Sequence, residues 1–228
     1  LARAGQFDFA VVSPGVALDS PLVKDLRQRE IPVISELELG WQQAVCLNVS
    51  VTGTNGKTTT TELIAHLLTH CHKRTLAVGN IGRPLCSVAD ETKQLDYLTL
   101  EVSSFQLETI RFFRPAVAVL LNLTPDHLDR HHTMADYARA KARLFENQQP
   151  FDWAIVQTEA LAMLRRTLGD ENLEVAACLN TLGQLLFGLG RPAEAEQRFG
   201  DGALVIDDFG LVLWHVNVLG VAVLETSG

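Results

Sequence analysis

The chain has 228 residues, with 27 acidic side chains against 19 basic ones and a formal net charge of −8 at pH 7. Hydrophobic residues make up 47% and charged residues 20%, a balance that allows a globular protein to bury a core. The basic residues are scattered, which argues against a nucleic-acid-binding protein, because a phosphate backbone requires clustered lysines and arginines. No apolar run approaches the roughly 20 residues that a membrane-spanning helix needs.

The four cysteines lie far apart and form no C-x-x-C pair; they are Cys46, Cys71, Cys86 and Cys178. That spacing favours reduced thiols in a cytoplasmic protein over a disulfide framework or a zinc site. The first residues lack an initiator methionine and the apolar centre of a signal peptide, so we expect a segment cut from a longer chain.

Residues 1–46 are expected to form a βαβ unit followed by a connecting helix. An apolar run over 7–12 predicts a strand that stops at the turn signal Ser13-Pro14-Gly15. Helical spacing predicts a helix over 22–29 and another over 36–43, with a strand over 31–34 between them. This block is typical of the closing part of a Rossmann-like domain.

Residues 47–158 alternate short β-rich runs with amphipathic stretches, the pattern of an α/β domain with a doubly wound, mostly parallel sheet. The expected strands are 47–51, 75–78, 97–102, 116–121 and 153–156, and the expected helices are 57–68 and 134–145. The first of these helices carries Leu63, Ile64, Leu67 and Leu68 at helical spacing. In such a fold, ligands bind beyond the carboxyl ends of the strands.

After residue 158 the composition changes, and we expect 159–228 to be a divergent, helical end of the domain. Helices are predicted over 174–189 and 193–199, and 173–206 resembles one tetratricopeptide repeat. Such helical hairpins normally need about three stacked copies for stability. A single copy therefore favours a docked helical hairpin, or a foreign segment, over a peptide-binding array.

The most informative motif is a glycine-rich loop between the expected strand 47–51 and the expected helix 57–68. Its residues are Gly53, Thr54, Asn55, Gly56, Lys57, Thr58 and Thr59. A loop of this kind gathers backbone N–H groups at a helix N-terminus, where phosphate binds. Lys57 supplies a charge for the outer phosphates and Thr58 a hydroxyl for Mg²⁺. Val51 stands where the general P-loop pattern has glycine, so the generic match is incomplete.

Three further side chains are placed for metal or phosphate chemistry. Glu101 ends a strand in the same sheet, where a carboxylate can bind Mg²⁺, although a solvated strand end explains it equally well. His127 follows another strand on the ligand-facing rim, although most histidines bind no ligand. Lys141 lies on a helix, and its residue type alone predicts a solvent-facing lysine.

These segments together resemble the Mur ligases, and within that family the D-glutamate-adding branch. The resemblance covers roughly residues 7–158 and rests on the segments 13–16, 35–39, 53–59, 79–82, 100–108, 122–131 and 137–145. Two of them, Gly79-Asn80-Ile81-Gly82 and the run over 100–108, separate this branch from its siblings. The resemblance implies a monomeric, cytoplasmic, ATP-dependent amide ligase of peptidoglycan synthesis.

The resemblance also implies a role for each matched residue. ATP would phosphorylate the carboxylate of UDP-N-acetylmuramoyl-L-alanine, and the amine of D-glutamate would then attack the acyl phosphate. Lys57, His127 and Lys141 would be catalytic, with Lys141 carbamylated so that it becomes a metal ligand. Magnesium ligands would be Thr58, Glu101, His127 and Lys141. Asn80 and Ser103 would contact the muramoyl substrate.

The chain also departs from the family pattern. The start of the UDP-substrate-binding domain and the domain that binds D-glutamate are missing, so we expect an incomplete fragment that is inactive in isolation. A Gly-x-His-Asn-x-x-Asn segment should end the central domain, and the chain offers a poor match at Trp214-His215-Val216-Asn217. The alternatives are a non-catalytic interaction protein that uses the helical hairpin, another P-loop ATPase, or a folate-polyglutamate ligase.

Overall fold

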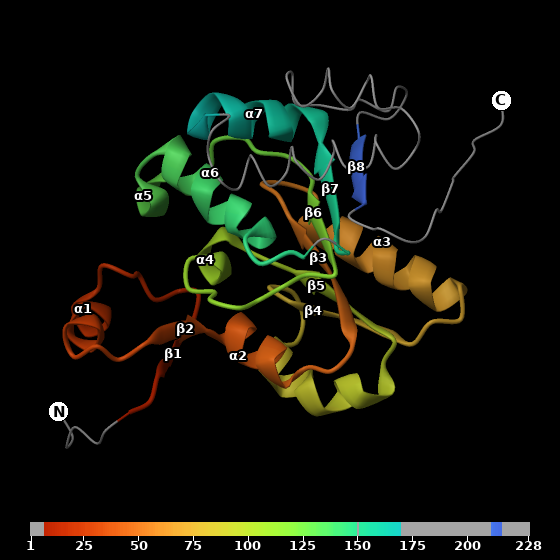
Figure 1. Cartoon of the computed structure of the whole chain (residues 1–228), viewed down its shortest axis with the longest axis horizontal. Helices are drawn as coiled ribbons and strands as arrows, with labels where there is room; N and C mark the ends of the chain where they lie inside the picture. Colours follow the sequence, from red (N-terminus) through yellow and green to blue (C-terminus); the bar gives the residue numbers. More distant parts are fainter. Residues whose placement is uncertain (1–6, 150, 170–210, 216–228) are drawn as a thin grey trace.

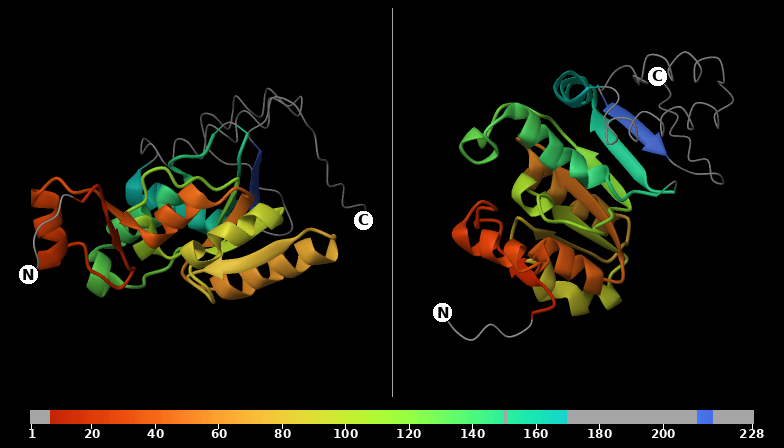
Figure 2. Two further views of the ribbon diagram at one scale, coloured as in Figure 1. Left: turned by 90° about the horizontal axis from the view of Figure 1, so that it is seen from below. Right: turned by 60° about the vertical axis from the view of Figure 1, so that its left-hand side comes forward.

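The computed structural model describes residues 7–149, 151–169 and 211–215 of the chain. Its main feature is a sheet of six strands in the order β4-β5-β3-β6-β7-β8. The bounds are β3 Leu47–Thr52, β4 Thr75–Gly79, β5 Tyr97–Glu101, β6 Val117–Leu120, β7 Trp153–Gln157 and β8 Leu211–His215. The first five pair in parallel, whereas β8 pairs antiparallel with β7 at the edge that Figure 2 shows. The mostly parallel α/β fold predicted from the sequence is therefore confirmed.

Helices cover both faces of this sheet (Figure 1). Their bounds are α3 Lys57–His70, α4 Ser104–Leu107, α5 Leu128–His131, α6 Met134–Ala142 and α7 Thr158–Leu168, with 3₁₀ segments at Leu85–Gln94 and Arg143–Phe145. Figure 1 shows α3 on one side of the strands and α4 and α6 on the other. The larger buried cluster lies on the α4 and α6 side, and the smaller one, built on Val49, Val51 and Val119, packs against Ile64 of α3.

The register of the central strands brings several loops to one edge. Glu101 at the end of β5 is paired with Val51 on one side and with Gly79, the last residue of β4, on the other. Thr52, which ends β3, is paired with Leu120, which ends β6. Parallel strands that end together place their following loops side by side, which is where α/β folds bind ligands.

The first block forms a small sheet of its own. Strand β1 (Ala10–Val12) pairs in parallel with β2 (Val33–Ser35), and helix α1 (Pro21–Gln28) connects them. The helix starts with a proline and its cap, Ser20, accepts a hydrogen bond from the Val23 N–H, which are both favourable signals for a helix start. Helix α2 (Glu36–Gln43) follows directly and leads into β3.

A buried carboxylate joins α2 to the main domain. Glu38 is 0% exposed, and its two oxygens accept the backbone N–H groups of Arg111, Phe112 and Phe113 at 2.9 to 3.2 Å. Gln42 donates a further bond at 2.8 Å. A buried charge is tolerated when it is fully hydrogen-bonded, so Glu38 fixes the position of α2 against the loop that follows α4.

The structure corrects details of the sequence predictions. The helix over 57–68 is confirmed. Leu63 and Leu67 are 53% and 52% exposed, because the face that packs on the sheet contains Ile64 of the predicted stripe together with Thr61. Helix α7 and the 3₁₀ segment over 85–94 were not predicted. The helices expected over 174–189 and 193–199 lie outside the described residues.

No helix in the described part of the chain is long and apolar enough to cross a membrane.

Substituting Glu38 with glutamine should lower the free energy of unfolding by about 3 kcal/mol, because an amide accepts fewer of the converging N–H bonds and leaves buried donors unpaired. Urea denaturation of Glu38→Gln measures the loss, with the exposed Glu62→Gln on α3 as the matched control. An equal, small change in both variants would contradict this role for Glu38.

Candidate functional site

The glycine-rich loop connects β3 to α3 and leaves the start of that helix open. Gly56 caps α3 in the left-handed region, with φ of 82°, a conformation that glycine adopts without steric cost. No side chain of the described residues caps the helix, so the N–H groups of its first turn, which have no intrahelical partners, are available to an anion. The geometry fits the phosphate cradle predicted from the sequence.

Asn122, from the loop after β6, holds the first half of this loop. Its side-chain oxygen accepts the backbone N–H of Thr54 at 3.0 Å and of Asn55 at 2.8 Å, and its amide donates to the Asn55 carbonyl at 3.0 Å. A methyl group at Gly53 would lie 3.1 Å from Cβ of Leu121, so the close approach of the two loops favours glycine there. The cradle is therefore fixed from the neighbouring strand.

Glu101, Thr58 and Asn80 form one hydrogen-bonded group at the carboxyl edge. The Thr58 hydroxyl donates to one Glu101 oxygen at 2.6 Å, and the Asn80 amide donates to the other at 2.8 Å. The main chain of Asn80 also donates to the Glu101 carbonyl oxygen at 2.8 Å. A carboxylate beside a hydroxyl at a phosphate loop is an oxygen ligand set of the kind that Mg²⁺ prefers.

Lys141 approaches the same loop from beneath. It is 2% exposed, and its ammonium donates to the Gly53 carbonyl at 2.8 Å and lies 3.4 Å from the Thr52 hydroxyl. Within the described residues no carboxylate forms an ion pair with it. Burial, with a contribution from the nearby Lys57, lowers the pKa of Lys141 to about 7. The solvent-facing position suggested by its residue type is wrong.

Lys57 and Thr54 complete the floor of the cradle. The Lys57 ammonium donates to the Thr54 carbonyl at 2.9 Å. The Thr54 hydroxyl lies 3.2 Å from the phenol oxygen of Tyr137 and accepts the Thr124 N–H at 3.1 Å. The Tyr137 ring lies under the Lys141 ammonium, 4.8 Å from it. The buried tyrosine therefore links helix α6 to the phosphate loop.

His127 lies on the rim, further from this group. Its backbone has a φ of 51°, its side chain is 49% exposed, and its ring nitrogen is 3.6 Å from an Asp126 oxygen. Its ring centre is 5.0 Å from that of Phe105. Among the described residues, His127 forms no hydrogen bond with the Glu101 group or with Lys141.

The remaining predicted residues have mixed positions. Thr59 follows Thr58 in the exposed first turn of α3. Ser103 caps α4: its hydroxyl accepts the Gln106 N–H at 3.3 Å, and its own N–H donates to the Gln106 side chain at 2.9 Å. In the described residues, no three His, Cys, Asp or Glu side chains gather as a metal site. Of the four candidate metal ligands, Thr58 and Glu101 are bonded to each other. In the described part of the chain, neither His127 nor Lys141 forms a hydrogen bond with that pair.

Sequence reasoning missed two residues that shape the site. Asn122 lies in a segment that carries the resemblance and Tyr137 lies in a predicted helix, but residue type and spacing do not predict that either one contacts the loop. Their bonds to the loop connect residues 67 to 83 positions apart. A polar residue directly after a strand end was the available signal for Asn122.

Comparison with known proteins shows which family the sequence resembles. The sequence profile of the Mur ligase middle domain matches residues 51–178, and that of the tetratricopeptide repeat matches 156–202. UDP-N-acetylmuramoylalanine–D-glutamate ligase of Koribacter versatilis is 49% identical over 152 residues, covering 67% of this chain and 34% of that protein. The ligase of the same name from Citrifermentans bemidjiense is 41% identical over 208 residues, covering 90% and 43%.

A solved structure of UDP-N-acetylmuramoyl-L-alanyl-D-glutamate–2,6-diaminopimelate ligase superposes with a TM-score of 0.48 and 24% identity, covering 77% of this chain and 49% of that one. The chain thus spans about a third to two fifths of the length of the two curated relatives.

The depressed pKa of Lys141 predicts a pH-dependent stability. Between pH 7 and the ordinary lysine value of about 10.4, the folded chain binds fewer protons than the unfolded chain, so the free energy of unfolding should rise with pH. Urea denaturation in bicarbonate-free buffer at several pH values measures this slope. Lys141→Met should flatten it, and an unchanged slope would contradict the buried, unpaired position of Lys141.

Proposed function

We propose a function for this chain from one premise: it belongs to the Mur ligase family, through the middle domain of that family. We infer that it is the nucleotide-binding part of an ATP-dependent ligase that joins D-glutamate to UDP-N-acetylmuramoylalanine. The names of the relatives at 41 to 49% identity support this substrate pair. Because the chain spans less than half of their length, the complete reaction belongs to the proposal.

One observation carries the proposal most strongly. Lys57, Thr58 and Glu101 converge at the open N-terminus of α3, with Thr58 bonded to Glu101 at 2.6 Å. The helix N-terminus and Lys57 would hold the β- and γ-phosphates of ATP. Bound Mg²⁺, held by Thr58 and Glu101, would neutralise the charge of the phosphate oxygens.

The proposed chemistry has two steps that these residues serve. A carboxylate oxygen of the acceptor attacks the γ-phosphorus of ATP, the bond to the bridging oxygen breaks, and ADP and an acyl phosphate form. The amine of D-glutamate then attacks the acyl carbon, so that an amide forms while phosphate leaves and the nitrogen loses a proton. Lys57 would bind the phosphoryl group through both steps, because its charge attracts the oxygens that move.

A pocket beside this edge supports the placement of the acceptor substrate. Its volume is about 430 Å³, and it lies between the first block and the sheet. Its lining includes Ser13, Pro14, Asn80 and Gln106. We propose that the muramoyl end of the UDP-linked substrate enters here, with Asn80 as a contact. Contact through Ser103, ligation by His127, a monomeric state and a cytoplasmic location stay predictions.

The tetratricopeptide match over 156–202 favours a second candidate function, a protein-interaction surface. That match covers about one repeat, and such arrays need about three copies. Further repeats downstream in the same gene would support the interaction function, whereas a glutamate-binding domain there would support the ligase.

Replacing Lys57 with alanine should weaken Mg²⁺–ATP binding at least about tenfold, because a hydrogen bond to a charged phosphate is lost. Isothermal titration calorimetry measures the dissociation constant, with the exposed Lys24→Ala on α1 as the matched control. Equal affinity in the two variants would exclude this loop as the phosphate site.

Lys141 should react with dissolved carbon dioxide, since a pKa of about 7 leaves much of its amine neutral and nucleophilic. The amine nitrogen bonds to the carbon and loses one proton, which gives a carbamate anion. Incubation with ¹³C-bicarbonate should produce a carbamate carbon resonance that Lys141→Arg abolishes. A resonance of equal intensity in both proteins would refute carbamylation at this residue.

A further inference from the structure

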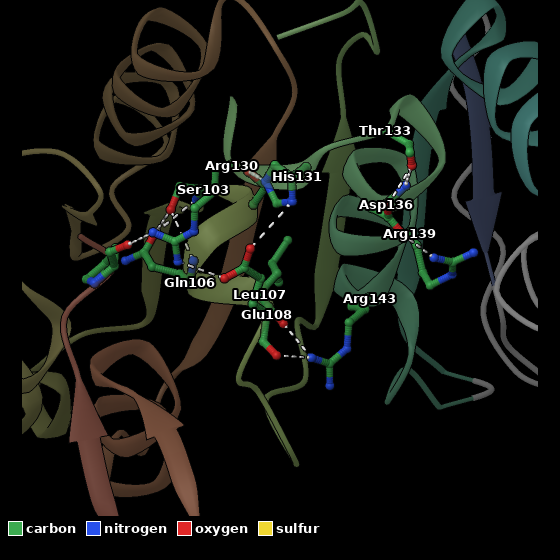
Figure 3. A network of polar contacts seen from close by, with 12 residues as sticks. Ser103, Gln106, Leu107, Glu108, Arg130, His131, Thr133, Asp136, Arg139 and Arg143 are labelled. Carbon is green, nitrogen blue, oxygen red and sulfur yellow. Dashed lines mark hydrogen bonds and ion pairs between the residues drawn. The ribbon is translucent and has the colours of Figure 1, made fainter. Parts of the chain in front are cut away.

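Arg130, on α5, connects three parts of the molecule that are distant in sequence. Its guanidinium donates to the Pro14 carbonyl at 3.2 Å, to the Val16 carbonyl at 3.0 Å and to a Glu108 oxygen at 2.9 Å, as Figure 3 shows in part. Its side chain is 17% exposed. The planar fork of an arginine presents five N–H donors in a fixed geometry, whereas a lysine ammonium is a compact point charge on a flexible stem.

The same guanidinium lies over an aromatic ring next to the rim histidine. The Arg130 carbon is 4.6 Å from the centre of the Phe105 ring. The Phe105 ring is in turn 5.0 Å from that of His127 and stacks on that of His131 at 5.4 Å. Phe105 of α4 therefore contacts the guanidinium and both histidine rings.

Glu108, the anionic partner, is itself firmly held. One of its oxygens lies 3.4 Å from a ring nitrogen of His131, whose other ring nitrogen is 2.9 Å from the Ser104 hydroxyl. Burial, together with Arg130, lowers the pKa of His131 to about 4, so this ring is neutral near pH 7. Arg143, in the 3₁₀ segment that follows α6, donates to the Glu108 carbonyl at 2.7 Å and so anchors the end of α4 (Figure 3).

Of the residues that Arg130 bonds, Pro14 lines the pocket of about 430 Å³, and Val16 and Glu108 each lie two residues beyond a lining residue. The lining residue nearest to this bond on the first block is Pro14, and the lining residue nearest to Glu108 is Gln106 of α4. An arginine that bonds both segments fixes the distance between the first block and the end of α4. Among the described residues, no hydrogen bond joins this guanidinium to the phosphate loop, Lys57 included.

We propose that Arg130 is a positioning residue for the acceptor substrate: it holds the loop 13–16 against α4 and so sets the width of the pocket. This inference rests on the proposed function, because it assigns the UDP-linked substrate to that pocket. The substrate's fit depends on both walls, whereas the nucleotide cradle is built from β3, α3 and Asn122. Loss of Arg130 should therefore affect one ligand and not the other.

The test compares Arg130→Met and Arg130→Lys with Arg139→Met, a matched control on α6 whose exposed guanidinium pairs with Asp136. Calorimetry measures the binding of UDP-N-acetylmuramoyl-L-alanine and of Mg²⁺–ATP separately. Both Arg130 variants should lose about tenfold or more in affinity for the UDP-linked substrate and less than about twofold for Mg²⁺–ATP. The control should change neither.

Hydrogen exchange of the backbone provides a second readout that does not need the substrate. In both Arg130 variants, exchange should become faster over residues 13–26 and stay unchanged in β3 and β5. Unchanged exchange there, or equal losses for both ligands, would overturn the proposal. If the unsubstituted chain binds no UDP-linked substrate, the proposed function fails, while the exchange pattern still decides whether Arg130 holds the loop.

Discussion

The parallel pairing of β3 with β5 and β6 is the constraint on which the rest of the site depends. Because Val51 is level with Glu101 and Thr52 with Leu120, three strands end together and release their loops at one edge. A shift of one residue along β5 would turn the Glu101 side chain to the opposite face of the sheet. The phosphate loop, the carboxylate and the Asn122 loop therefore come together as a consequence of strand register, before any ligand contributes.

The cradle carries a local cost in stability that its neighbours offset. Lys141 is a buried cation with carbonyl and hydroxyl partners, and burial disfavours its charged form. The loop above it needs glycine at Gly56 and the support of Asn122. A sequence selected for stability alone would not place a buried lysine here without a carboxylate partner. A buried lysine with a depressed pKa is typical of binding and catalytic sites.

The sequence predicted the layered α/β fold, the strand ends and the phosphate loop, because these depend on short-range patterns. It did not predict how the site is held together. The buried position of Lys141 follows from how α6 packs under the loop, and the contacts of Tyr137 and Arg130 join residues more than 80 positions apart. Periodicity also misjudged α3, where Leu67 is exposed, because it locates an apolar stripe without showing which face meets the sheet.

One edge of the sheet is proposed to bind a divalent metal together with a nucleotide. The most direct test is the paramagnetic broadening of backbone amide NMR signals by Mn²⁺ in the presence of ADP. The broadening falls steeply with distance from the metal. We expect the signals of Thr58 and Glu101 to disappear first, while those of Val45 and Phe112, at the amino ends of the strands, keep their intensity. Broadening spread evenly over both edges, or independent of ADP, would contradict it.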